Sequence, residues 1–122
     1  YSPLTLAFLG DCVYDIIIRT VVVERGNRAP QGLHKKKSYL VNAKAQKELV
    51  ESIQDLLTFE EEDIYRRGRN AKSYSTAKNA SIGDYRKATG FEALLGYLYL
   101  NDQMDRVLYL VKEGLNRIGA KI

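Results

Sequence analysis

Cysteine and proline are almost absent from this sequence of 122 residues. The one cysteine, Cys12, cannot form a disulfide within the chain, and a cysteine-based zinc cluster is likewise excluded. A single cysteine agrees with a reducing compartment, so we expect a cytoplasmic protein. The chain has only two prolines, Pro3 and Pro30, so most of its segments are free to form uninterrupted helices.

The sequence also lacks a hydrophobic run long enough to cross a membrane. Its most apolar segment, YDIIIRTVVVERG, is interrupted by Asp15, Arg19 and Glu24. No secretory signal is visible, and we expect no membrane partner. With 45% apolar and 28% charged residues, the composition is that of a folded domain. The length allows one domain over residues 1–122.

Motifs of several common enzyme classes are missing. The sequence contains no GxxxxGK[ST] phosphate loop, no HExxH zinc motif and no GxSxG nucleophile motif. The only histidine, His34, stands beside a lysine run, where a surface position or a phosphate contact is a better interpretation than a general base. Cys12 has no histidine at a suggestive spacing, so the sequence does not indicate a side-chain nucleophile.

Helical periodicity, by contrast, repeats along the whole chain, and strand-type alternation is hard to find. We therefore predict an all-α fold. The expected helices cover residues 4–24, 33–57, 58–68, 84–101 and 104–119, and the second can be broken between Leu40 and Asn42. Thr58 is expected to cap the third helix, which the charges of Arg66 and Arg67 and the breaker Gly68 should end. Loops are expected at 26–33 and 72–83.

Positive charge is concentrated in two zones although the net charge is only +4. Residues 34–47 carry five lysines and no acid, and residues 66–87 carry seven basic residues against Asp84. Such zones are expected where a protein follows phosphates, and the alternative is a pair of solvated faces. The second zone mixes arginine, asparagine, serine and tyrosine (RRGRNAKSYSTAKN), residue types that hydrogen bond phosphate and ribose.

The first helix has one apolar face too many for a surface helix. One stripe contains Leu6, Leu9, Val13 and Ile16 or Ile17, and the other contains Phe8, Cys12 and the flank from Tyr14 to Ile18. The helix is therefore either central or covered by another subunit. Asp11 lies between the stripes and is expected to be buried, so it needs a cation or several donors. Gly10 beside it indicates close approach of another backbone.

Glu92 is the second candidate acid. It lies in YRKATGFEALLGYLYL, a segment that is apolar on most sides and has Gly90 and Gly96 for close packing. Two such helices suggest one site in which both carboxylates bind a hard cation. The alternative is that Asp11 and Glu92 form structural ion pairs with Arg19, Arg86 or Lys87. Asp15 can support Asp11 or pair with Arg19 four residues later.

Three separated motifs resemble the ribonuclease III family. LAFLGDCVYD is similar to its first signature helix, and KATGFEALLGYLYL is similar to its second. Together with LHKKKSYLVNAKAQ and RRGRNAKS, they resemble the short bacterial branch of mini-ribonucleases III, which has the catalytic domain and no appended RNA-binding domain. The resemblance implies an all-α, homodimeric endonuclease domain.

The resemblance also implies the chemistry and the site. Asp11 and Glu92 match the catalytic, metal-binding carboxylates, with Mg²⁺ as cofactor and Mn²⁺ as a substitute. Ala7 and Thr89 stand where larger relatives have two further carboxylates, and Asp15 and Thr89 are expected to support the site. The implied activity is double-stranded-RNA cleavage that leaves 5′-phosphate ends and matures the ends of the large-subunit (23S) ribosomal RNA precursor. The alternatives are a catalytically inactive RNA-binding dimer and a purely structural dimer.

Two further sets of residues follow from the resemblance. Phe8 and Cys12 are expected at the dimer interface, with Phe8 inserted into the partner. The residues expected to contact RNA come from both basic zones: His34, Lys35, Lys36, Arg67, Arg69, Asn70, Lys72, Lys78, Asn79 and Arg86.

Overall fold

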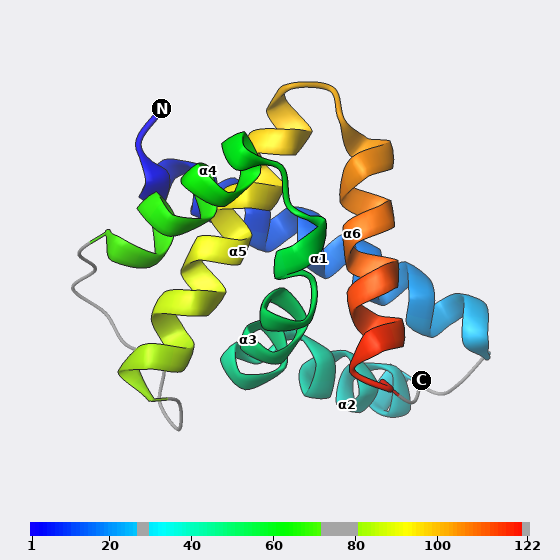
Figure 1. Ribbon diagram of the computed structural model, residues 1–122. Helices are drawn as coiled ribbons and strands as arrows, with labels where there is room; N and C mark the ends of the chain where they lie inside the picture. The colour runs from blue at the N-terminus through cyan, green and yellow to red at the C-terminus, as the bar shows by residue number, and fades with distance from the viewer. Residues whose placement is uncertain (27–29, 72–80, 121–122) are drawn as a thin grey trace.

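The computed structural model describes residues 1–26, 30–71 and 81–120 and places them in an all-helical fold (Figure 1). The helices are α1 (Pro3–Arg25), α2 (Pro30–Val41), α3 (Ala43–Ser52), α4 (Phe59–Asn70), α5 (Ile82–Leu100) and α6 (Met104–Arg117), with a 3₁₀ turn η1 (Gln54–Leu56). No strand occurs within these ranges. The predicted fold class is confirmed.

Helix boundaries follow local capping chemistry. The Ser2 hydroxyl accepts a hydrogen bond from the Thr5 amide at 3.2 Å, and Pro3 occupies the first turn of α1. Asn42 caps α3 by accepting from the Ala45 amide at 2.8 Å, and this cap produces the break expected between 40 and 42. Thr58 caps α4 as predicted, because its side chain and that of Glu61 form a reciprocal capping box.

Several boundaries differ from the sequence-based expectation. The sequence predicts a second helix that reaches residue 57, but α3 ends at Ser52 and a 3₁₀ turn follows. Helix α5 begins at Ile82, two residues early, and α6 ends at Arg117, two residues early. The second helix begins at Pro30, so the loop expected over 26–33 is shorter. The predicted end of α4 at Gly68 is wrong, because the helix continues to Asn70. Gly68 is instead buried against α5, where an added Cβ would lie 2.7 Å from the Ala93 methyl carbon. This glycine permits helix contact and does not break the helix.

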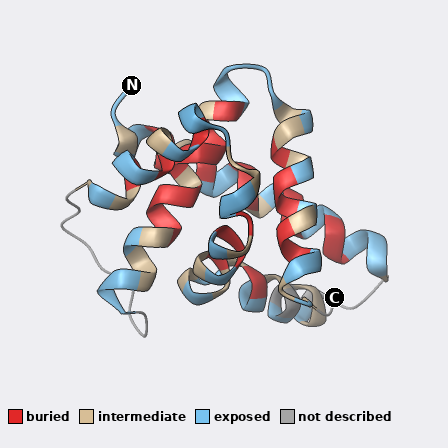
Figure 2. Cartoon of the chain, viewed as in Figure 1, coloured by how far each residue is buried: buried red, intermediate tan, exposed pale blue. Residues whose placement is uncertain are grey.

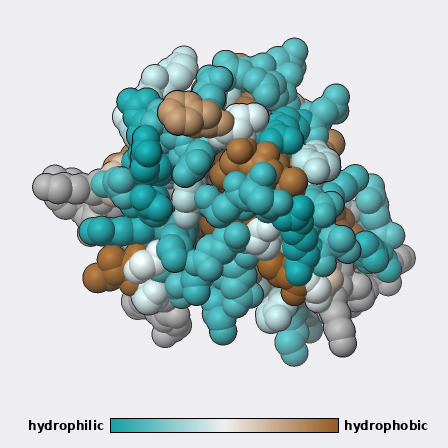
Figure 3. Space-filling view, viewed as in Figure 1, coloured by the Kyte–Doolittle hydropathy of each residue, from teal (hydrophilic) through white to brown (hydrophobic). Residues whose placement is uncertain are grey.

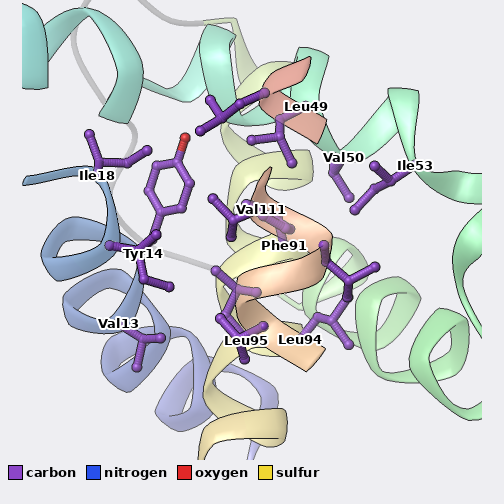
Figure 4. Packing of buried hydrophobic residues seen from close by; sticks show 14 of the residues in the cluster. Val13, Tyr14, Ile18, Leu49, Val50, Ile53, Phe91, Leu94, Leu95 and Val111 are labelled. Carbon is purple, nitrogen blue, oxygen red and sulfur yellow. The ribbon is translucent and has the colours of Figure 1, made fainter. Parts of the chain in front are cut away.

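Helix α5 runs through the middle of the molecule, and α1, α4 and α3 make the most extensive contacts with it (Figure 1). Most of its residues from Ala88 to Leu98 are buried, and Figure 2 shows this part of the helix mainly in red. Figure 4 shows how Phe91, Leu94 and Leu95 of α5 meet the core residues of α1, α3 and α6. The expectation that this segment is apolar on most sides is confirmed.

Tyr14 of α1 is a core residue, which corrects its assignment to the second apolar stripe. Its ring meets Phe91 edge to face at a centroid distance of 5.6 Å, and its hydroxyl donates to the Leu40 carbonyl at 2.8 Å (Figure 4). The hydrogen bond satisfies the buried hydroxyl and ties α1 to the end of α2. Ile18, one turn later, is also fully buried.

Ile17 of the second stripe is buried too, but Phe8, Cys12 and Ile16 stay exposed, and Leu4 extends their row on α1. Leu4, Phe8, Cys12 and Ile16 follow one another at intervals of four residues, and all are exposed on α1. Phe8 is 81% exposed. Residues four apart share one helix face, so this α1 stripe is a continuous apolar surface. Helix α1 passes behind α5 in Figure 1. The face turned to the viewer is largely hydrophilic, with small hydrophobic patches (Figure 3).

Glycines allow the central crossing between α1 and α5, as predicted from the sequence. A Cβ added at Gly10 would overlap the carbonyl oxygen of Glu92, and one added at Gly96 would overlap that of Leu6. Both obstacles are backbone atoms, so a side-chain rearrangement cannot relieve them. Backbone contact at this crossing fixes the separation between Asp11, next to Gly10, and Glu92 in the middle of α5.

We expect Gly96→Ala to lower the free energy of unfolding by about 3 kcal/mol, at the upper end for overpacking. The added methyl group must separate α1 from α5. Gly83→Ala is the matched control, because its Cβ would meet nothing closer than the Ser81 hydroxyl at 3.9 Å. This control should be neutral or stabilising, since alanine favours helix over glycine. Urea unfolding measures both, and equal effects would contradict the crossing geometry.

Candidate active site

The crossing of α1 and α5 brings the carboxyl groups of Asp11 and Glu92 within hydrogen-bonding reach of each other. Asp11 is adjacent to Gly10, which packs on the backbone of Glu92 itself. The two acids are therefore held together by main-chain contact between helices. The two acids singled out in the sequence thus lie together, and their role as one metal site stays a prediction.

The electrostatic environment of Glu92 is unfavourable for a charge. Burial, together with the hydrogen bond and the negative charge of Asp11, raises the pKa of Glu92 to about 8, although the Gln46 side chain partly offsets this. Without a bound cation, Glu92 therefore carries a proton near neutral pH. Two carboxyl groups this close cannot both ionise easily, because the charge on one disfavours the charge on the other.

No described lysine or arginine side chain forms an ion pair with either acid. Arg19 instead pairs with Asp15 at 2.7 Å, and Lys87 pairs with Glu51 at 2.7 Å. Arg86 lies exposed on α5. The alternative in which Asp11 and Glu92 form structural ion pairs with these cations is therefore not seen.

Asp11 itself is exposed, and the expectation that it is buried is wrong for the single chain. It lies beside the α1 stripe, next to Cys12, while its carboxyl group stays close to Glu92 of α5. Glu92 is the more enclosed member of the pair. An exposed acid beside an enclosed one gives a site that is open to a ligand from one side.

The other positions named from the family pattern have local structural partners. Ala7 is buried and packs with Leu6 and Ala93. The buried Thr89 hydroxyl donates to the Tyr85 carbonyl at 3.0 Å. Asp15 contacts Arg19 and, at 3.2 Å, Lys37, so the predicted i, i+4 ion pair is confirmed. The supporting roles of Asp15 and Thr89 in the site stay predictions.

The carboxylate pair fits a hard divalent cation. Oxygen ligands suit Mg²⁺, which binds through one or two carboxylates and keeps several waters. The described residues contain no cluster of three or more acidic, histidine or cysteine ligands, so a metal here would be held by Asp11 and Glu92 and remain largely hydrated. A cation would also relieve the repulsion that raises the pKa of Glu92.

Those residues predicted to contact RNA that the structure describes lie on three helices. Arg67, Arg69 and Asn70 occupy the last turn of α4, Arg86 is on α5, and Lys35 is exposed on α2. Arg69 stacks over the Tyr65 ring at 5.7 Å. His34 and Lys36 belong to α2, but their side chains lie outside the described part, as do Lys72, Lys78 and Asn79 entirely.

Sequence reasoning missed Gln46, whose side chain adjoins Glu92. It is only 4% exposed and comes from α3. The signal was present: Gln46 precedes Leu49, Val50 and Ile53 at the i, i+3, i+4, i+7 spacing of a buried helix face. A polar residue at a core position is the feature to question.

Comparison with known proteins gives a consistent result. The model of the family described as "Ribonuclease III domain" matches residues 4–103. A Mini-ribonuclease 3 of Thermoanaerobacter sp. (strain X514) is 55% identical over 106 residues, covering 87% of this chain and 75% of the relative. The Mini-ribonuclease 3 of Enterococcus faecalis is 45% identical over 120 residues, covering 97% and 91%. A crystal structure of a Fusobacterium nucleatum protein superposes with a TM-score of 0.84 at 30% identity, covering 95% of this chain and 93% of that one.

Proposed function

Because this chain belongs to the ribonuclease III family and is therefore an endoribonuclease of double-stranded RNA, we propose that it matures the ends of the 23S ribosomal RNA precursor in the cytoplasm. The convergence of Asp11 and Glu92 at the α1–α5 crossing is the observation that carries the proposal. Family members depend on a divalent metal ion, and the ion proposed here is Mg²⁺, with Mn²⁺ as a substitute. None of the helices in the described ranges has the length and apolarity of a membrane span.

Asp11 and Glu92 are the residues that would hold the cation. When bound, a divalent ion of this kind supplies an activated water and neutralises the charge that develops on the leaving oxygen. Burial and the nearby Asp11 raise the pKa of Glu92 to about 8, so the carboxyl group holds a proton near neutral pH without metal. A carboxylate must be ionised to bind a metal ion, so Glu92 would release this proton on binding. The backbone contact at Gly10 keeps both carboxylates in place during the reaction. No side-chain nucleophile is needed.

The exposed basic residues of α2, α4 and α5 suit duplex RNA. A-form RNA is recognised through its phosphates, its 2′-hydroxyls and its shape, so arginines and lysines can bind it without reading the bases. Arg67, Arg86 and Lys35 are exposed. We assign them, with the other predicted contacts, to phosphate binding. The affinity should fall steeply with salt, because each phosphate contact releases counterions.

The α1 stripe is the proposed dimer interface. Leu4, Phe8, Cys12 and Ile16 form an apolar surface that a second copy of the same helix can cover. A surface pocket lined by Tyr1, Leu6, Ile64, Tyr97, Leu100 and Asn101 lies near the start of α1 and is a candidate receptor for Phe8 of the other copy. Asp11 is adjacent to Cys12 in this surface, so each subunit of the dimer carries a site close to the interface. The two sites would then act on opposite strands of the RNA duplex.

We expect Phe8→Glu to convert the dimer to monomers. Burying a phenylalanine side chain contributes about 1.5–3 kcal/mol, and a two-fold interface contains the residue twice, so the association constant should fall at least a hundredfold. Sedimentation velocity measures the change. Phe59→Glu is the control for the change in charge, because Phe59 is 89% exposed and lies at the start of α4, not on α1. A dimer that survives Phe8→Glu would contradict the proposed interface.

The function is tested with a duplex stem from the end of a 23S precursor and a single strand of the same sequence. We expect cleavage of the duplex alone, with 5′-phosphate ends, in Mg²⁺ and not in excess chelator. Binding without cleavage would favour the inactive RNA-binding dimer, the alternative suggested by Ala7 and Thr89. Equal cleavage of unrelated duplexes would contradict the ribosomal assignment while leaving the nuclease activity in place.

A further inference from the structure

Gln46 is a buried polar side chain in contact with the proposed site. It projects from α3, it is 4% exposed, and its amide adjoins the Glu92 carboxyl group on α5. Its neighbours on the same helix face, Leu49 and Val50, are fully buried core residues. Gln46 is therefore the polar end of an otherwise apolar surface, and this polar end faces Glu92.

The amide group is fixed at its nitrogen and free at its oxygen. The Nε2 atom of Gln46 donates a 2.8 Å hydrogen bond to the carbonyl oxygen of Val41, the last residue of α2. The Oε1 atom is buried and has no hydrogen-bond partner among the described residues. A buried acceptor without a donor is unfavourable, and such groups in native proteins call for a specific explanation.

Packing alone does not explain glutamine at this position. A leucine of similar volume would fill the same space between α3 and α5 without an unpaired oxygen. The polar group becomes useful if its two ends act on the metal site. One end can hold the Glu92 carboxylate through the amide hydrogens, and the other can accept from water carried by a hydrated cation. Residues that orient metal ligands in this way strongly affect metal affinity.

We propose that Gln46 is a positioning residue of the Asp11–Glu92 site. The Val41 carbonyl fixes the amide, and the amide orients the Glu92 carboxylate towards Asp11. Oε1, which has no partner among the described residues, would accept a hydrogen bond from a water of a bound, hydrated cation. The inference rests on the proposed function for the identity of the site, and it adds a neutral third group to two carboxylates. Such a group compensates in part for the carboxylates absent at Ala7 and Thr89.

The first test compares Gln46→Leu with Gln54→Leu. Gln54 is the matched control, because its Nε2 also donates to a backbone carbonyl, that of Val50 at 3.0 Å, but its side chain is exposed and does not adjoin Glu92. In metal titrations followed by the electron paramagnetic resonance of free Mn²⁺, we expect Gln46→Leu to weaken binding about tenfold or more. Its kcat on duplex RNA should fall by about 10–100-fold with KM nearly unchanged. Gln54→Leu should match the wild type in both.

The second test uses Gln46→Glu, which keeps the shape and adds a negative charge beside Glu92. We expect this variant to have a lower Tm than the wild type in chelator and a larger upward Tm shift with Mn²⁺. This Tm measurement still tests the inference if the Gln46→Leu variant fails to fold. Wild-type Mn²⁺ affinity in Gln46→Leu, or a wild-type Tm shift in Gln46→Glu, would overturn the inference. A wild-type protein that binds Mn²⁺ without cutting RNA would contradict the proposed function, and the metal titrations would still decide the role of Gln46.

Discussion

Asp11→Asn and Glu92→Gln should each lower the rate of duplex RNA cleavage by about a thousandfold or more. A bound divalent ion contributes several kcal/mol of transition-state stabilisation, and each 1.4 kcal/mol corresponds to a factor of ten. Removing one of two protein ligands takes away most of that contribution, because no third acidic ligand is available among the described residues. Single-turnover cleavage of a duplex stem in saturating Mg²⁺ measures the loss.

The control for this prediction separates lost chemistry from lost folding. Asp105→Asn makes the same chemical change at an exposed position in the first turn of α6 and should cleave at the wild-type rate. Glu92→Gln should unfold at no lower urea concentration than the wild type at pH 8, because it removes a carboxyl group that burial and Asp11 hold above its usual pKa. If Asp11→Asn cleaves as fast as Asp105→Asn, Asp11 has no place in the mechanism.

The helices could be predicted from the sequence because their signals are local. Ser2, Asn42, Thr58 and Ser81 each cap a helix with their own side chain, and such caps need only three or four neighbouring residues. Gly68 shows where local reasoning fails. A glycine near two arginines has the pattern of a helix end, but here it serves contact with α5, which depends on the tertiary fold.

The site was only partly accessible from the sequence. Lone acids beside glycines pointed to Asp11 and Glu92, since a glycine within a helix marks a close crossing. Their exposure could not be predicted, because it depends on which of two apolar stripes meets α5. Gln46 was missed because its importance comes from a neighbour on another helix. Asp15 had a local ion-pair partner, and the local interpretation identified Arg19 correctly.

The largest effect on stability is expected from pH, through Glu92. Its pKa is about 8 in the folded chain, against 4.5 for an ordinary glutamate, because of burial and the adjacent Asp11. Between these values the native state keeps a proton that the unfolded state has released. The contribution of Glu92 to the free energy of unfolding should therefore be complete below about pH 4.5. It should fall by roughly 1.4 kcal/mol per pH unit as the pH rises towards 8. Across the window the loss is several kcal/mol.

Urea unfolding in chelator from pH 5 to pH 8 tests this, with Glu92→Gln as the reference that removes all other titrations. The difference in unfolding free energy between wild type and Glu92→Gln isolates the effect of the Glu92 carboxyl group. Asp11→Asn should narrow the pH range over which stability is lost, because burial alone then raises the pKa of Glu92. Mg²⁺ should stabilise the wild type more at pH 8 than at pH 5, since the cation favours the ionised pair. A pH-independent difference from Glu92→Gln would mean that Glu92 ionises as an exposed acid does. The enclosed carboxylate pair at the α1–α5 crossing would then have no energetic consequence.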